Sequence, residues 1–156
     1  MPLFTASSSS VAHSFVKEGI VPDVIHDINP KVLVLVRYGE KDVGQGEILS
    51  VHETQERPRI LLVPRDSSPD NGGKYTVVLA DPDAPSRADP KWRNCAHWVH
   101  SGLSLSMPES LAQTGNTGGT NLSEGNEILE YTGPAPTEAT GLHRYCFLVF
   151  KAWLLF

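Results

Sequence analysis

The sequence predicts a β-rich domain, and three observations lead to this fold class. Twelve prolines and thirteen glycines divide the 156 residues into short segments, which favours strands and turns over long helices. The apolar runs between them are rich in valine, isoleucine, leucine and aromatic residues, as strands are. The sequence has no heptads, no internal repeats and no regular alternation of strand and helix patterns. We expect residues 1–156 to form one domain, because this length suits a single hydrophobic core.

The chain is expected to begin with a flexible segment and a short helix. Residues 1–10 contain a run of serines and are expected to be flexible. Apolar side chains recur at helical spacing within residues 11–19, and Ser10 is a suitable N-cap for a helix there. Residues 20–25 are interrupted by a proline and predict an extended segment.

Six later segments have the composition of strands, and polar loops connect them. The connection at residues 104–126 is longer than most in compact domains, so we expect a functional loop or partial disorder there. Asp89 followed by Pro90 predicts one short turn of helix or 3₁₀ helix. The predicted strands cover residues 31–38, 59–63, 75–80, 96–103, 127–131 and 143–150.

The composition excludes several classes of protein. The net charge of −5 gives no overall electrostatic attraction to nucleic acid or to an anionic membrane surface. No positive residue precedes Lys17 and no apolar run follows the first methionine, so a secretory signal is not expected. No stretch approaches the ~18 apolar residues of a membrane-spanning helix. Two cysteines are too few for a disulfide framework, and we expect a cytoplasmic protein with free thiols.

Residues 81–100 gather polar groups at the end of a predicted strand. The strand at residues 75–80 leads into Asp81 and Asp83, whose spacing directs both carboxylates to the same side. Prolines keep the following chain out of regular pairing, and the next strand brings His97 back. Two carboxylates and a histidine at one end of a sheet predict a polar pocket.

The last predicted strand supplies a second histidine. Alternation along a strand places His143 and Tyr145 on one face and Arg144 on the other. The same rule directs Cys95 and His97 into the pocket. The other cysteine points away from it, so a disulfide is not expected.

These side chains suit an oxyanion ligand. Histidine and tyrosine supply hydrogen-bond donors, and an aspartate behind a histidine fixes its tautomer and favours its protonated form. Gly133, which precedes Pro134, would let the backbone approach a bound anion closely. The same groups could instead serve acid–base chemistry, and a lone histidine on a strand is often only structural. The histidine spacing predicts no metal site, and the sequence contains no nucleophile elbow or phosphate-binding glycine loop.

Two segments resemble the signature regions of the phosphatidylethanolamine-binding protein family. They are DPDAPSRADPKWRNCAHW at residues 81–98 and YTGPAPTEATGLHRYCFLVF at residues 131–150. Residues 20–25 are also similar to the family's N-terminal half. The resemblance implies a β-sandwich of two antiparallel sheets with a few short peripheral helices.

The resemblance also implies a ligand-binding site that needs neither a cofactor nor a metal. The expected ligand is phosphate or a phospholipid head group. Asp83 and Pro85 would shape the pocket wall, with a cis peptide bond between Ala84 and Pro85. The implied ligand-binding residues are Asp81, Asp83, Pro85, His97, Gly133, Pro134, His143 and Tyr145.

The function implied by the resemblance is regulatory and not enzymatic. We expect a protein that binds phosphate-bearing lipids and either inhibits a serine carboxypeptidase or modulates a protein kinase pathway. One alternative is an enzyme of small-molecule biosynthesis, in which the histidines and aspartates promote dehydration, isomerisation or cyclisation. Another is a scaffold whose pocket no longer binds a ligand.

The sequence departs from the family pattern in three places. Thr137 and Ala139 occupy positions that are usually proline and glycine in the second signature. Cys95 stands where an aromatic residue is common. Residues 152–156 replace a further strand and a C-terminal helix. We therefore expect an exposed sheet edge, self-association through that edge and a more open pocket.

Overall fold

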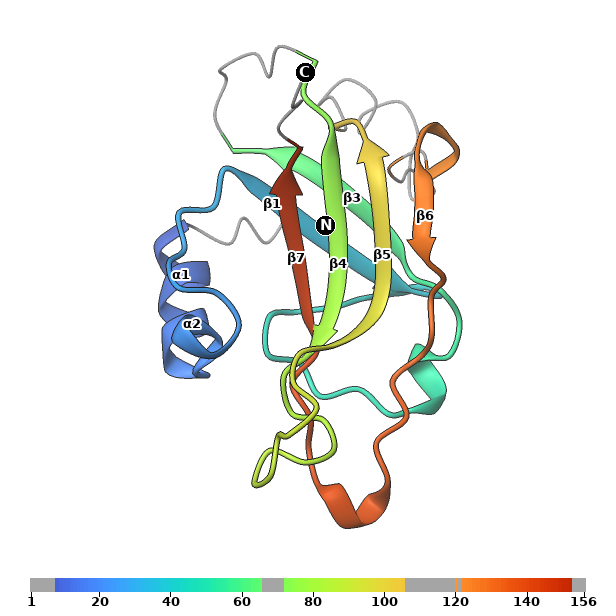
Figure 1. Ribbon diagram of the computed structural model, residues 1–156. Helices are drawn as coiled ribbons and strands as arrows, with labels where there is room; N and C mark the ends of the chain where they lie inside the picture. The colour runs from blue at the N-terminus through green and yellow to red at the C-terminus, as the bar shows by residue number, and fades with distance from the viewer. Residues whose placement is uncertain (1–7, 66–71, 106–119, 121, 153–156) are drawn as a thin grey trace.

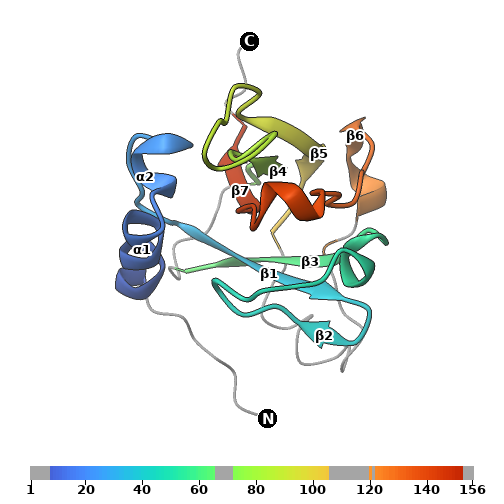
Figure 2. The same ribbon diagram turned by 90° about the horizontal axis from the view of Figure 1, so that it is seen from below.

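The chain folds into two antiparallel β-sheets that pack face to face. The computed structural model describes residues 8–65, 72–105, 120 and 122–152. Its strands are β1 (Val32–Tyr38), β2 (Lys41–Asp42), β3 (Arg59–Pro64), β4 (Tyr75–Asp81), β5 (Cys95–Leu103), β6 (Asn126–Leu129) and β7 (Cys146–Lys151). The strand order is β2-β1-β3 in the smaller sheet and β6-β5-β4-β7 in the larger sheet. Figure 1 shows β1 and β3 crossing behind the larger sheet, and Figure 2 shows the two layers from below. This architecture confirms the predicted β-sandwich.

The hydrophobic core lies between the two sheets. Leu62 of β3, Leu79 of β4 and Trp98 of β5 are all 0% exposed. Val77 is buried on the same side as Leu79, because residues two apart on a strand face the same way. The indole N–H of Trp98 is also satisfied, since it donates to the Glu127 carboxylate at 2.8 Å.

A second apolar cluster covers the outer face of the larger sheet. Its centre is Ile20 packed with Cys146 and Leu148 of β7. Ile20 begins α2 (Ile20–Asp23), which follows α1 (Ser8–Lys17). Both helices lie beside β7 in Figure 1. The peripheral helices therefore shield apolar side chains that would otherwise face water.

The N-terminal segment differs from the prediction in two ways. The helix α1 begins before Ser10, which therefore lies inside the helix and is not its N-cap. Residues 20–25, which were expected to be extended, contain α2, in which the Val24 N–H donates to the Ile20 carbonyl at 2.9 Å. Within this segment Val21 keeps extended backbone angles (φ −101°, ψ 118°), as a residue before proline favours, so the helical turn is interrupted by a kink there.

All six predicted strands are present. Several ends differ by one residue, β6 ends at Leu129 instead of residue 131, and the largest difference is at the start of β7. Residues 143–145 precede β7 instead of belonging to it. The cause is a side chain on another loop, because the Arg144 N–H donates to the Asp83 carboxylate at 2.8 Å and not to a neighbouring strand.

Two loop predictions have different outcomes. The single turn of helix or 3₁₀ expected after Asp89–Pro90 corresponds to one hydrogen-bonded turn, in which the Arg93 N–H donates to the Pro90 carbonyl at 3.1 Å. Most of residues 104–126 lies outside the described residues, as do 1–7 and 153–156. The described end of the long connection forms a short 3₁₀ helix, η3 (Leu122–Glu124).

We predict that Gly125→Ala destabilises the fold by about 2 kcal/mol or more, because overpacking moves the backbone. A Cβ at residue 125 would lie 2.0 Å from the Ser101 carbonyl oxygen of β5. Gly44→Ala is the matched control, because its Cβ would be 3.4 Å from the end of the flexible Glu47 side chain. Urea denaturation of both variants tests this. Equal unfolding midpoints would contradict it.

Candidate functional site

Asp81, the last residue of β4, is the centre of a buried group of hydrogen bonds. Asp81 is 3% exposed. One carboxylate oxygen accepts the Asp83 backbone N–H at 2.7 Å, and the other lies 2.7 Å from Nδ1 of His143. The Tyr145 hydroxyl is close enough to this carboxylate for the Asp81 charge to raise its pKa. Asp81 therefore fixes the orientation of His143 and selects the tautomer that carries a proton on Nδ1.

The rings of His143, Tyr145 and His97 lie next to one another. The His143 and Tyr145 rings are stacked with centroids 6.2 Å apart, and Tyr145 meets His97 edge to face at 5.3 Å. Burial raises the pKa of Tyr145, and the nearby Asp81 charge raises it further, so the phenol keeps its proton. Nε2 of His143 lies 3.0 Å from the Thr140 hydroxyl. The predicted grouping of the two histidines around Tyr145 is therefore present.

His97 reaches this group through an irregularity in β5. The pairing with β4 shifts by one residue, so that Leu79 pairs with Trp98 while Ala80 pairs with Ala96. His97 is the extra residue of a β-bulge, a feature that re-aims a side chain. The simple alternation expected along residues 95–100 is therefore wrong at this point.

The bulge leaves one nitrogen of His97 available. Nδ1 donates to the Thr132 carbonyl oxygen at 3.0 Å, and the Thr132 N–H donates back to the His97 carbonyl at 2.8 Å. Nε2 makes no hydrogen bond with any residue that the structure describes. The half-buried ring thus offers one nitrogen to a ligand.

Asp83 faces away from the histidines. Its side chain is 0% exposed and accepts three hydrogen bonds from Arg144: from the backbone N–H at 2.8 Å, from Nε at 2.9 Å and from Nη2 at 2.6 Å. Burial alone would raise the pKa of Asp83, but the hydrogen bonds and charge of Arg144 hold it below its usual value. Asp83 therefore holds Arg144, the residue between His143 and Tyr145, and its side chain does not line the same space as His97.

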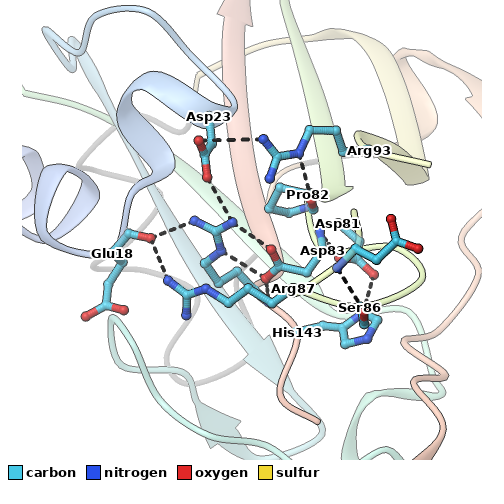
Figure 3. A network of polar contacts seen from close by, with 11 residues as sticks. Glu18, Asp23, Asp81, Pro82, Asp83, Ser86, Arg87, Arg93 and His143 are labelled. Carbon is cyan, nitrogen blue, oxygen red and sulfur yellow. Dashed lines mark hydrogen bonds and ion pairs between the residues drawn. The ribbon is translucent and has the colours of Figure 1, made fainter. Parts of the chain in front are cut away.

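Arg144 extends this support to the N-terminal helices. Figure 3 shows two further arginines at the same place, Arg93 beside Asp23 and Arg87 beside Glu18. Its guanidinium donates to the Asp23 carboxylate at 3.1 Å and to the Glu18 carbonyl at 2.7 Å. Arg93 lies 3.6 Å from Asp23, and Arg87 donates to the Glu18 carbonyl at 3.4 Å. Three arginines from two loops thus converge on Glu18, which follows α1, and on Asp23, the last residue of α2.

Gly133 and Pro134 join the site to the smaller sheet. A Cβ on Gly133 would lie 2.9 Å from the Thr54 carbonyl oxygen, at the end of the 3₁₀ helix η1 (His52–Thr54). Gln55 donates from its side chain to the Pro134 carbonyl at 2.9 Å. Gly133 is therefore explained by close packing between two backbones, whereas its role toward an anion stays a prediction.

The remaining predicted features are also placed by the structure. The Ala84–Pro85 peptide bond is cis, as expected, and Pro85 is half-buried next to the Asp83 turn. Cys95 is an exposed free thiol and Cys146 a buried one. Burial raises the pKa of Cys146 to about 12, which keeps that thiol protonated.

Sequence reasoning did not identify three contributors to the site. They are the Thr132 carbonyl, the Thr140 hydroxyl and the Arg144 guanidinium. Only Arg144 had a sequence signal, since alternation placed it opposite His143 and Tyr145. Among the described residues, no group of three potential ligands is arranged to hold a metal ion.

Comparison with known proteins assigns the family. The model for the phosphatidylethanolamine-binding protein family matches residues 39–153. The chain belongs to this family. The carboxypeptidase Y inhibitor of Saccharomyces cerevisiae is 33% identical over 159 residues, which cover 88% of this chain and 71% of the inhibitor.

Solved structures of phosphatidylethanolamine-binding proteins and their relatives have the same fold. The carboxypeptidase Y inhibitor complexed with its cognate proteinase superposes with a TM-score of 0.80 at 30% identity, covering 97% of this chain and 76% of that one. The phosphatidylethanolamine-binding protein of Plasmodium vivax gives 0.70 at 29% identity, covering 88% and 68%. In the part of this chain that the structure describes, no helix is long and apolar enough to cross a membrane.

We predict that Asp83→Asn lowers the free energy of unfolding by about 3 kcal/mol, because it removes the fully buried counter-charge of Arg144 and leaves only the longer contact with Asp23 at 3.1 Å. Because the pKa of Asp83 is lower in the folded protein than in the unfolded chain, the ionised carboxylate stabilises the fold. This stabilisation is complete above the unfolded-state pKa of about 3.9 and is lost as the pH falls through the folded-state pKa. The variant should lack this acid-dependent loss. Urea denaturation at a series of acidic pH values measures both effects.

Asp89→Asn is the control for this prediction. Its carboxylate is 68% exposed and pairs with Lys91 at 3.6 Å, so its removal should cost less than about 1 kcal/mol. A stability of Asp83→Asn equal to that of Asp89→Asn would refute the proposed role of the buried ion pair.

Proposed function

We propose that this protein binds a phosphate-bearing ligand, such as a phospholipid head group, beside His97, His143 and Tyr145. The observation that carries the proposal is the free Nε2 of His97, whose ring lies 5.3 Å from the Tyr145 ring. A protonated histidine donates from both nitrogens and adds a positive charge, which suits a phosphate oxygen. Of the eight residues that the sequence predicts, Asp83 and Pro85 would then support this site from outside it.

The carboxylate of Asp81 is compatible with an anion nearby because its charge is already compensated. It receives hydrogen bonds from the Asp83 N–H and from His143. Such donors stabilise a carboxylate that is 4% exposed. In this proposal Asp81 organises the donors, and the anion contacts the more accessible His97.

The proposed role is regulatory, by binding and not by catalysis. A second candidate function, inhibition of a serine carboxypeptidase, is supported by the resemblance to the carboxypeptidase Y inhibitor at 33% identity. It is also supported by the TM-score of 0.80 to that inhibitor in its complex with the cognate proteinase. An inhibitor of this kind need not use the anion pocket for its peptidase contacts.

Ligand binding is tested by following the histidine resonances in NMR spectra during titration with phosphate and phosphoethanolamine. We expect His97 and His143 to shift, and His97→Ala to weaken binding about tenfold or more, because a charge-assisted hydrogen bond is lost. His26→Ala, an exposed histidine on the loop after α2, is the control. Unchanged His97 and His143 resonances at saturating phosphate would exclude the proposed pocket.

Peptidase inhibition is tested separately with a purified serine carboxypeptidase. We expect the wild-type protein to inhibit substrate hydrolysis, and His97→Ala to inhibit it equally well. Equal inhibition would follow because interface affinity depends on a few anchor residues, and the pocket histidine is not expected to be one. If neither protein inhibits the peptidase at micromolar concentration, this second function is wrong.

A further inference from the structure

The outer side of the smaller sheet carries aliphatic side chains. Every second residue of β1, beginning with Val32, packs against the core, so alternation directs Leu33 and Leu35 outward. Applied to the buried positions of β3, the same rule directs Leu61 and Val63 outward. Leu33 pairs with Val63 across the two strands, and Leu35 pairs with Leu61. These four side chains therefore form one contiguous patch, called here the outer aliphatic face.

The outer aliphatic face has no cover among the described residues. Neither of the two apolar clusters includes any of its four side chains, and Leu35 is 44% exposed. The outer side of the larger sheet is different, because Ile20 packs there on β7. Figure 2 shows the smaller sheet as one outer layer of the molecule, with α1 and α2 to one side of it. A contiguous apolar patch on an outer layer is typical of a protein interaction site.

A row of charged side chains borders the face at one end. Arg37 of β1 pairs in register with Asp42 of β2 on one side and with Arg59 of β3 on the other. Arg37 donates to the Asp42 carboxylate at 2.7 Å, and Arg59 donates to Glu40 at 3.1 Å. The side chain of Asp42 is 66% exposed, against 17% for that of Arg37. The row thus joins two cations to two anions, and one of its acids projects well into solvent.

We propose that the outer aliphatic face binds the same face of a second copy of this chain. A two-fold axis that runs parallel to the strands over β1 stacks the aliphatic pairs of the two copies on each other. The same axis reverses the order of the charged row, so Asp42 of each copy lies opposite Arg59 of the other. Sheets pack face to face about 10 Å apart in this way, as the two sheets inside the protein do.

Charge complementarity favours a second copy as the partner. Across the sheet the row reads Asp42, Arg37, Arg59, so its two ends differ in sign and match when the row is turned over. At the centre Arg37 meets Arg37, but each guanidinium is already held by two hydrogen bonds from its own Asp42. An aliphatic centre with a charged rim is also the usual anatomy of a protein interface. This surface differs from the sheet edge near residue 152, where the sequence predicts self-association.

Sedimentation equilibrium of the full chain over a range of concentrations tests the dimer. We expect a monomer–dimer equilibrium for the wild type. Leu35→Lys should raise the dissociation constant at least about a hundredfold, because two-fold symmetry places two unpaired ammonium groups in an apolar centre. Ile128→Lys is the matched control, since Ile128 lies on β6 of the larger sheet and is 68% exposed. It should dimerise like the wild type.

A mixing experiment tests the charged row and does not depend on Leu35→Lys. Asp42→Arg and Arg59→Glu should each weaken dimerisation at least about tenfold, because like charges then face each other at both symmetric contacts. An equimolar mixture of these two variants should regain wild-type association. In the mixed dimer the introduced arginine faces the introduced glutamate, and the second contact keeps its original pair.

Three results would overturn the proposal. The first is a wild-type protein that stays monomeric at millimolar concentration. The second is a dimer that Leu35→Lys leaves intact, and its loss in Phe150→Lys would assign the interface to β7, where Phe150 is 49% exposed. The third is a mixture of Asp42→Arg and Arg59→Glu that associates no better than its components.

The dimer and the proposed ligand binding are tested independently. Asp81 and His97 belong to strands of the larger sheet, on the other side of the core. We therefore expect Leu35→Lys to keep the wild-type shift of the His97 resonance with phosphoethanolamine. A wild type that dimerises through Leu35 but shows no such shift would leave the dimer standing and exclude the pocket.

Discussion

The buried ion pair of Asp83 and Arg144 is the constraint on which the rest of the site depends. A carboxylate with no solvent contact needs a hydrogen-bonded cation, and Arg144 supplies three donors to it. Because Arg144 is held on one side of an extended chain, its neighbours His143 and Tyr145 must point to the other side. The same guanidinium reaches Asp23 and so fixes the N-terminal helices. One ion pair thereby positions the pocket and its peripheral support.

Much of the fold follows from local sequence, but some of the site does not. The β-branched runs predict the strands because apolar composition determines which segments can be buried. The two signature segments predict that Asp81, His97, His143 and Tyr145 belong to one site. The bulge that re-aims His97 depends on its pairing with β4, a contact between residues far apart in the chain. Patterns within one strand carry no information about such a shift in register.

The same limit explains the other differences. The start of β7 moved because a backbone N–H is taken by Asp83, whose residue number is 61 lower. The helical turn of α2 forms where Ile20 packs on β7, although its composition resembles an extended segment. Gly133 was interpreted through an expected ligand, yet the nearest atom to an added Cβ belongs to Thr54 of the 3₁₀ helix η1. In each case tertiary contacts override the local preference.

The contact of Gly133 with Thr54 also links the proposed pocket to the junction between the two sheets. Thr54 belongs to the connection between strands of the smaller sheet, and its carbonyl also accepts the Tyr131 hydroxyl at 2.6 Å. The neighbouring Thr132 holds His97 on the larger sheet. A ligand that binds only the closed arrangement adds its binding energy to the junction between the layers. Ligand binding in the pocket would then stabilise the packing of the two sheets against each other. Separation of the sheets would become rarer as the ligand concentration rises.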